Sequence, residues 1–384
     1  MFISVYTIAK NEEQIAERWY NCFKEADECC VLVNNSSDKT AEILKRLGAK
    51  VKVKNYLQFR FDTARNDAMK MCSKKADLLF GCDMDDTVES GWREKIELAW
   101  RKALELGWNP NAILYSYSVI YSNDGPKQTF SRHLIHTPND WYWKHRIHEY
   151  LDSKKEKVYV YYPKFEVISR PIRQEHGQYL SMLEEDCNEP DCEARSKHLL
   201  AREYMQHGRL EEAIDWFNRH LSSPDAIWKS ERAASMRFLS DCYGRLGFEN
   251  ARELWLWKAM FENPKDRDAP FILGQLLIQK KQYTSAIDIL EKCLSIEKPE
   301  FDYPYYILDE WTERPVLCLA EAKYYSGDWN GALKEVDRAL KMNPSSTMGL
   351  RMKSEIENII RSGKKPPLCF KKEHSVRIEI PELS

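Results

Sequence analysis

The sequence predicts an α/β domain built on a mainly parallel sheet, followed by an all-α domain of helical repeats. Three observations lead to this fold class. The chain has 384 residues, and a chain of this length usually divides into more than one domain, each with its own hydrophobic core. Apolar strand-like runs alternate with amphipathic stretches in the first half, whereas only helical patterns follow. We therefore divide the chain into residues 1–180, residues 181–362 and a tail over residues 363–384.

The first half reads as alternating strands and helices. Strands are predicted over Ile3–Ile8, Cys29–Val33, Val51–Val53, Leu78–Cys82 and Ile113–Tyr121. Helices are predicted over Glu12–Glu25, from about Asp38 onward, over Asp62–Cys72 and over Gly91–Leu106. The Asp-x-Thr turn at Asp38 is typical of a helix start. This alternation favours a parallel sheet covered on both faces, which binds ligands at the carboxyl ends of its strands.

The second half repeats a unit of about 34 residues, which is the period of tetratricopeptide repeats. The clearest copy places Leu199–Ala201, Tyr204 and Gly208 before Glu211–Phe217. Looser copies contain Leu239, Tyr243, Gly247 and Ala251; Leu273, Gly274, Tyr283 and Ala286; and Leu319, Ala320, Tyr324, Gly327 and Ala332. Small residues at these offsets let paired helices approach closely. An ordinary helical bundle is the alternative. The tail, with alternating apolar residues near its end, is either a linker with an edge strand or a frayed end.

Composition and charge bound the class of protein. Hydrophobic residues make up 43% and charged residues 31%, which is a globular composition. The net charge of -2 gives no support to duplex DNA as partner, although a local basic groove is not excluded. The start of the chain lacks the pattern of a signal peptide, and no window is apolar enough to span a bilayer. We expect a cytoplasmic protein without a membrane partner.

Cysteine usage points to reduced thiols. The chain has 11 cysteines, an odd number. Cys29, Cys30, Cys187 and Cys192 show neither the CxxC pairing nor the following histidine pairs that are typical of zinc sites.

The strongest chemical signal is an apolar strand that ends in three carboxylates, Asp83, Asp85 and Asp86. Like charges this close raise one another's pKa unless a cation lies among them. Carboxylate oxygens favour hard cations, so the motif predicts bound Mg²⁺ or Mn²⁺. The alternative is a solvated turn that caps the helix beginning near Trp92.

Several motifs together carry a family resemblance. Residues 8–13, 61–66 and 82–86 resemble, in order and spacing, the successive signatures of family 2 glycosyltransferases of the GT-A fold. Arg132, the stretch Arg146–Glu149, His176–Gly177 and the helical repeats are similar to the subgroup that includes bacteriocin peptide S-glycosyltransferases of the sublancin type. The resemblance covers nearly the whole chain.

The resemblance implies a role for each matching residue. Donor-binding residues would be Ile8, Ala9, Asn11, Glu12, Asn34, Arg65, Asp83, Met84 and Arg146. Metal ligands would be Asp83, Asp85 and His176. Glu149 would be the general base, and His148 would orient the reactants or contact the diphosphate.

Each of these roles has a structural alternative. Arg65 is either a donor contact or a surface arginine paired with Asp62 or Asp67. Glu149 is either the base or a partner in a salt bridge to Arg146 or Arg132. His176 is either a metal ligand or a group held by a structural hydrogen bond.

One position departs from the family pattern. Family members usually carry acidic residues after the second strand, where this chain has Val33 and Asn34. An amide both donates and accepts hydrogen bonds, so Asn34 still offers a contact to a nucleobase edge, with a preference different from that of a carboxylate. The prediction of a uridine donor is weakened accordingly.

The residues and the resemblance together predict an inverting glycosyltransferase that uses a nucleotide sugar such as UDP-glucose and Mg²⁺ or Mn²⁺. The helical repeats would contact the acceptor, a peptide or protein side chain. Modified DNA or a glycan as acceptor is an open alternative, as is a non-catalytic scaffold whose repeats bind a peptide. Whether the chain forms a homodimer is also left open.

Overall fold

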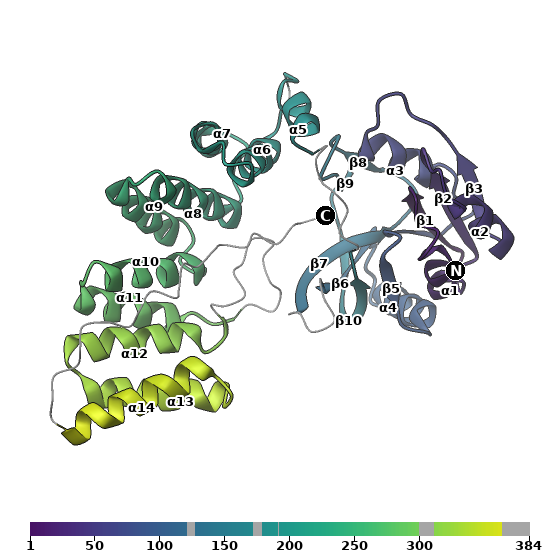
Figure 1. Cartoon of the computed structure of the whole chain (residues 1–384). Helices are drawn as coiled ribbons and strands as arrows, with labels where there is room; N and C mark the ends of the chain where they lie inside the picture. The colour runs from purple at the N-terminus through teal and green to yellow at the C-terminus, as the bar shows by residue number, and fades with distance from the viewer. Residues whose placement is uncertain (121–126, 172–178, 191, 299–310, 363–384) are drawn as a thin grey trace. The chain divides into compact units, whose positions relative to one another are not determined.

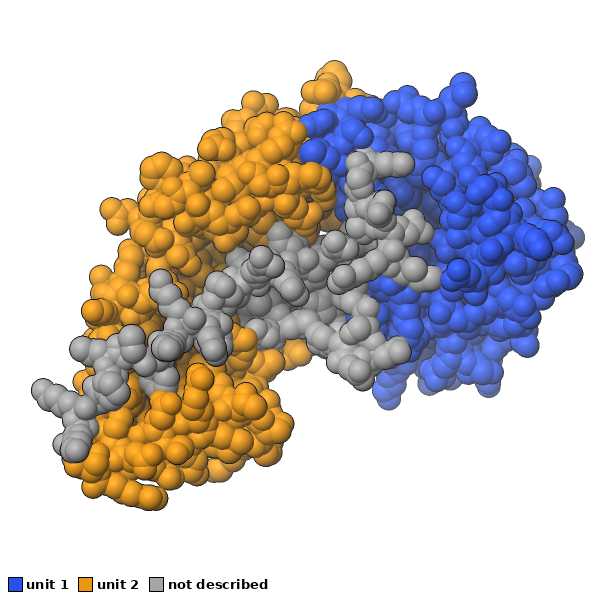
Figure 2. Space-filling view, viewed as in Figure 1, with its two compact units in different colours: residues 1–186, 384 blue, residues 187–383 orange. Residues whose placement is uncertain are grey.

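The structure is a computed structural model that describes residues 1–120, 127–171, 179–190, 192–298 and 311–362. The chain forms two compact units. Unit 1 runs from Met1 to Asp186, and unit 2 begins at Cys187 (Figures 1 and 2). Unit 1 contains the strands and unit 2 is helical throughout its described part, so the predicted fold class is confirmed.

An eight-stranded sheet with the order β3-β2-β1-β4-β7-β6-β10-β5 forms unit 1. Its strands are β1 (Ile3–Ala9), β2 (Glu28–Val33), β3 (Lys50–Val53), β4 (Leu78–Gly81), β5 (Asp86–Val88), β6 (Ala112–Ile120), β7 (Lys127–His136) and β10 (Tyr159–Ser169). The four strands from β3 to β4 are parallel, as are β6 and β10. The mainly parallel sheet that the alternating pattern predicts is therefore present.

The strands that the sequence did not predict are β5, β7, β8 (Trp141–Lys144), β9 (Tyr150–Ser153) and β10. Most of them pair in antiparallel fashion: β7 between β4 and β6, β5 on β10, and β8 with β9 in a separate ribbon. Alternation of strands with helices signals only the parallel part of a sheet. Strands β7 to β10 follow one another without intervening helices, so this signal does not extend to them, and β5 is only three residues long.

Four helices cover the sheet of unit 1, and they match the predicted ones with shifts of a few residues. They are α1 (Ala16–Phe23), α2 (Thr40–Leu47), α3 (Phe61–Met69) and α4 (Trp92–Glu105). Helix α1 starts four residues later than the predicted Glu12, and the backbone N–H groups of Glu12 and Glu13 donate to the side chains of Thr40 and Asp38. Asp38 also accepts the N–H of Thr40, in line with the predicted helix start.

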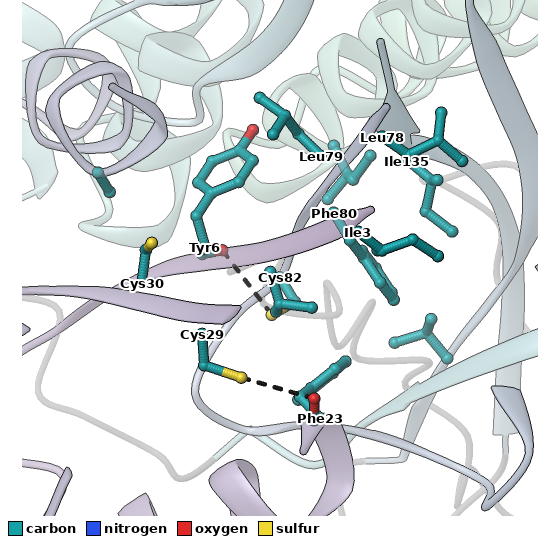
Figure 3. Packing of buried hydrophobic residues seen from close by; sticks show 14 of the residues in the cluster. Ile3, Tyr6, Phe23, Cys29, Cys30, Leu78, Leu79, Phe80, Cys82 and Ile135 are labelled. Atoms are coloured by element: carbon teal, nitrogen blue, oxygen red, sulfur yellow. Dashed lines mark hydrogen bonds between the residues drawn. The ribbon is translucent and has the colours of Figure 1, made fainter. Parts of the chain in front are cut away.

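The register of β1 and β4 shows which side chains lie on each face of the sheet. Val5 pairs with Phe80 and Tyr6 with Gly81, so Phe80 and Tyr6 point to opposite faces. Phe80 packs against Phe23 of α1 and Trp92 of α4. On the other face, a Cβ at Gly81 would lie 2.8 Å from the hydroxyl of Tyr6, so only glycine fits beside it. Figure 3 shows Tyr6 and Phe23 on opposite sides of β1.

Unit 2 is a series of helices that pack in consecutive pairs (Figure 1). The helices are α6 (Ala194–Gln206), α7 (Leu210–Ser222), α8 (Lys229–Arg245), α9 (Glu249–Glu262), α10 (Asp268–Gln279), α11 (Tyr283–Ser295), α12 (Arg314–Ser326), α13 (Trp329–Met342) and α14 (Thr347–Ser362). Helix α5 (Tyr179–Cys187) precedes them. A Cβ at Gly274 would lie 2.6 Å from Leu290, so α10 and α11 approach as closely as the repeat pattern predicts.

The turns inside these pairs explain part of the repeat signal. Gly208, Gly247 and Gly327 have positive φ angles of 76°, 84° and 93°, a conformation that glycine adopts without strain. In the third pair, Lys281 takes the equivalent place with φ of 59°. That copy therefore lacks the glycine that the other three have at this turn.

Two further observations concern the whole described chain. The ten cysteines among the described residues are all free thiols. No described helix is both long and apolar enough to cross a membrane.

Candidate active site

The three carboxylates after β4 lie together in the fold. Ligand oxygens of Asp83, Asp85 and Asp86 lie within 4.8 Å of one another, as the acidic motif predicts. The group does not cap the next helix, because α4 begins after Gly91 without a side-chain cap, and Asp86 instead opens β5. The capping alternative for this motif is therefore not what the fold adopts.

Neighbouring side chains fix two of the carboxylates. Asp86 is buried, accepts a hydrogen bond from the Tyr117 hydroxyl at 2.9 Å and accepts the backbone N–H of Asp83 at 2.9 Å. Asp85 accepts a hydrogen bond from the Ser169 hydroxyl at 3.0 Å. Strands β6 and β10 thus position the loop that follows β4.

The electrostatics of the cluster suit a divalent cation. Burial, followed by repulsion from Asp83 and Asp85, raises the pKa of Asp86 well above its ordinary value. Burial and the charge of Asp83 also raise the pKa of Asp85. Glu12 is affected in the same way: burial and the nearby carboxylates, Asp85 foremost, raise its pKa to about 7. A hard cation among these oxygens would remove the repulsion.

Arg65 of α3 connects the acidic cluster to the predicted base. It is buried, it pairs with Asp83 and it donates through Nε to Glu149 at 2.5 Å. Its guanidinium lies 4.6 Å from the ring centre of Trp143. Burial alone would raise the pKa of Asp83, but the charges of Arg65 and Arg132 outweigh it and lower that pKa. The alternative of a surface pair with Asp62 or Asp67 does not hold, since Arg60 and Lys54 pair with those residues.

Arg132 of β7 is the second cation near the cluster. Its guanidinium lies 3.8 Å from the ring centre of Tyr117, the residue that hydrogen-bonds Asp86. The sequence showed Arg132 only as part of the family resemblance. Its proximity to the carboxylates depends on β7 pairing with β6 and β4, which the sequence pattern did not predict.

Glu149 and His148 follow the β8 strand in a strained segment. His148 has φ of 53° and packs its ring edge-on against Tyr179 of α5. The Glu149 side chain is only 9% exposed, and desolvation raises its pKa in spite of the attraction of Arg65. Its ion-pair partner is Arg65, whereas the structural alternative named Arg146 or Arg132.

The remaining predicted donor residues divide into two groups. Arg146 is buried and pairs with Glu185 of α5, and its carbonyl accepts the N–H of Phe61. Met84 is buried within the acidic loop. The predicted metal ligand His176 lies outside the described residues.

The other group lies at the carboxyl ends of β1 and β2. Ile8 and Ala9 end β1, and the N–H of Asn34 donates to the carbonyl of Ala9 at 2.9 Å. Asn11 has φ of 57° and links the two strand ends, since its Oδ1 accepts the N–H of Ser37. The side-chain Oδ1 of Asn34 is buried and has no hydrogen-bond partner among the described residues. An orphaned acceptor at a strand end is the arrangement expected where a ligand donates.

Comparisons with family models match one segment in unit 1 and two segments in unit 2. Residues 4–177 match the family model "Glycosyl transferase family 2", and residues 194–223 and 271–299 match a tetratricopeptide repeat model. A comparison with curated protein sequences found no significant match.

Solved structures resemble part of the chain. A structure of YrrB, described as a TPR protein with an unusual peptide-binding site, is 16% identical and covers 46% of this chain and 81% of its own, with a TM-score of 0.35. A MamA structure is 18% identical and covers 45% of this chain and 97% of its own, with a TM-score of 0.35. A thermophilic TPR protein from Thermus thermophilus is 17% identical and covers 47% and 89%, with a TM-score of 0.32. By the family models, residues 4–177 are similar to glycosyl transferase family 2, and two segments of unit 2 are similar to tetratricopeptide repeats.

Proposed function

We propose that this protein transfers a sugar from a nucleotide sugar, with a UDP-hexose as the first donor to test, to a nucleophilic side chain of a peptide or protein, with inversion at the anomeric carbon. The observation that carries the proposal is the contact chain from Asp83 through Arg65 to Glu149. It couples a carboxylate cluster at a strand end with a buried carboxylate suited to proton transfer. The match to the family 2 model supports the same chemistry.

Asp83 and Asp85 are the proposed ligands of Mg²⁺ or Mn²⁺. Asp86 differs from them because its two oxygens already accept from Tyr117 and from the N–H of Asp83. We therefore assign Asp86 to positioning the loop. When bound, the cation would neutralise the diphosphate leaving group. His176 is kept as a proposed additional ligand on the family resemblance alone.

Donor recognition is proposed for the ends of β1 and β2. The unpartnered Oδ1 of Asn34 would accept a hydrogen bond from a nucleobase edge, such as the imide N–H of uracil. Ile8, Ala9, Asn11 and Glu12 would border the nucleoside, while Met84 and Arg146 would contact the rest of the donor. Because Asn34 replaces an acidic residue, we expect tolerance of more than one base.

Glu149 is the proposed general base. Its burial raises its pKa toward the working pH, which favours proton transfer from a hydroxyl or thiol acceptor. Arg65 holds Glu149 in place and balances its charge. His148, in contact with Tyr179, is proposed to orient the reactants.

Peptide or protein is proposed as the acceptor class because tetratricopeptide repeats build extended binding surfaces from paired helices. The protein would then bind donor through unit 1 and acceptor through unit 2.

A panel of sugar nucleotides tests the proposal. The full chain, Mn²⁺ and each nucleotide sugar are incubated with cell extract, and intact masses of extract peptides and proteins are measured. We expect a gain of one sugar on an acceptor, abolished by EDTA. Retained peptide binding without binding or hydrolysis of any donor would overturn the enzyme assignment and leave a scaffold.

A second experiment locates the acceptor. A peptide identified in that screen is given a photo-reactive group and cross-linked to the full chain, and the adducts are mapped by mass spectrometry. Adducts within residues 194–362 support acceptor binding by the repeats. Adducts confined to residues 1–186 would remove the repeats from acceptor selection, and labelling only by DNA or glycan probes would change the acceptor class.

A further inference from the structure

A second group of potential metal ligands lies in unit 1, outside the acidic cluster. It consists of Glu28 and Cys30 on β2 and Cys72, which follows α3. The two sulfurs and a carboxylate oxygen lie within 4.8 Å of one another. Cys30 is buried, while Glu28 and Cys72 are half-buried, so the group has both shelter and access to solvent.

Hydrogen bonds hold the carboxylate of Glu28 in a fixed orientation. Its Oε1 accepts from the Ser4 hydroxyl at 2.7 Å and from the backbone N–H of Ser73. Its Oε2 lies 4.0 Å from the ammonium of Lys50. Lys50 in turn donates to the carbonyl of Met71. The Oε2 atom is therefore oriented by the protein and still able to bind a ligand.

We propose that Glu28, Cys30 and Cys72 bind a thiophilic divalent cation, Zn²⁺ being the representative ion, in a site separate from Asp83 and Asp85. Two thiolates, one carboxylate, a divalent cation and the ammonium of Lys50 sum to zero charge. At Zn–S distances of about 2.3 Å, tetrahedral ligand atoms lie roughly 3.8 Å apart, so atoms already within 4.8 Å need shifts of only about 1 Å. Water can occupy the fourth position.

The two sites would select different ions. Asp83 and Asp85 offer oxygen only and favour hard cations, whereas two sulfurs favour a soft or borderline ion. The thiol site also lies away from the proposed nucleobase contact: Asn34 lies four residues beyond Cys30, roughly 13 Å at the usual strand rise. A cation here would join β2 to the end of α3, the helix that carries Arg65.

The metal itself serves as the probe. The full chain is purified under reducing conditions, stripped with a chelator and titrated with Co²⁺, whose thiolate complexes absorb intensely in the near ultraviolet. We expect this band at one equivalent, its displacement by Zn²⁺, and a rise in melting temperature with Zn²⁺. Cys72→Ser removes one of the two sulfur ligands, so it should lose at least about half of the band and weaken Zn²⁺ binding by about 10-fold or more, because even outer-shell changes cost 10-fold to 100-fold.

Matched variants keep the test decisive. Cys22→Ser replaces another half-buried thiol of unit 1, on α1, and should keep the band. Glu28→Gln retains an acceptor for Ser4 and Ser73, and should weaken Zn²⁺ binding even if Cys72→Ser folds poorly. Absence of a thiolate band in the folded wild type, an equal band in Cys72→Ser, or a Cys30–Cys72 disulfide in the reduced preparation would overturn the site.

Discussion

Each unit of this protein buries an arginine between two carboxylates, yet the two clusters differ in access. In unit 1, Arg65 pairs with Asp83 and Glu149. In unit 2, Arg237 lies 2.5 Å from Asp268 and 3.7 Å from Asp266. The Asp83 side chain is 30% exposed, whereas those of Asp268 and Arg237 are 0% and 2% exposed.

The second cluster has a structural task that explains its charges. Asp266 accepts the N–H of Asp268 at the start of α10, and Arg237 links that helix start to α8. In unit 1 the carboxylates lie at the end of a parallel strand. Burial and a neighbouring carboxylate raise the pKa in both clusters, of Asp85 and Asp86 in unit 1 and of Asp266 in unit 2. Burial of charge therefore does not by itself mark a functional site. The exposed edge and the surplus of negative charge at a strand end distinguish the first cluster.

The largest effect is expected for Glu149→Gln. The amide keeps the shape but cannot take a proton, so turnover should fall by roughly 10²-fold to 10⁴-fold, the usual range for a lost general base. Binding of the nucleotide sugar, measured by calorimetry, should change little. Turnover within about threefold of wild type would return Glu149 to a structural role and make His148 the next residue to test.

The Arg237 cluster of unit 2 should behave in the opposite way: its disruption should lower stability and leave turnover unchanged. Asp268→Asn leaves Arg237 without its closest charge, and breaking a buried pair costs about 3 kcal/mol, the low end of the usual range because Asp266 remains nearby. Denaturant unfolding measures this loss. Donor hydrolysis per folded molecule should stay at the wild-type level, and a large loss there would mean that the two clusters do not differ as argued.

The acidic strand end should depend on a divalent cation. Asp85→Asn removes one proposed ligand and should lower turnover by about 10²-fold to 10³-fold, comparable to the loss of one electrostatic contact to a transition state. Titration of Mn²⁺ should show weaker binding by the variant. Full activity of Asp85→Asn in the presence of EDTA would exclude the metal assignment.

The smallest effect concerns Glu12 and pH. Its folded pKa of about 7 lies above the ordinary 4.5, so its protonated form favours folding at low pH, and that contribution is lost as the pH rises through 7. Glu12→Gln should therefore melt at a higher temperature than wild type at pH 8 and at nearly the same temperature at pH 4. Mn²⁺ should reduce the difference at pH 8. An equal difference in melting temperature at pH 4 and pH 8 would contradict electrostatic repulsion between Glu12 and the neighbouring carboxylates.

The sequence by itself determined the features that depend on near neighbours in the chain. Apolar runs predicted the strands β1 to β4 and β6, and the repeat of about 34 residues in the second half predicted the helix pairs. Asp83, Asp85 and Asp86 are placed together by sequence proximity alone. Asn34 stood out because the resemblance to family 2 glycosyltransferases implies an acidic residue at this position.

Only the tertiary structure decided which distant residues meet. Arg65 and Glu149 are 84 positions apart, and Tyr117 reaches Asp86 across 31 positions through strand pairings that the sequence pattern did not reveal. Cys30 and Cys72 have no spacing typical of a metal site, yet β2 and the end of α3 bring them together. Local patterns record burial and periodicity, whereas partner choice depends on sheet order, and sheet order is fixed by packing over the whole domain.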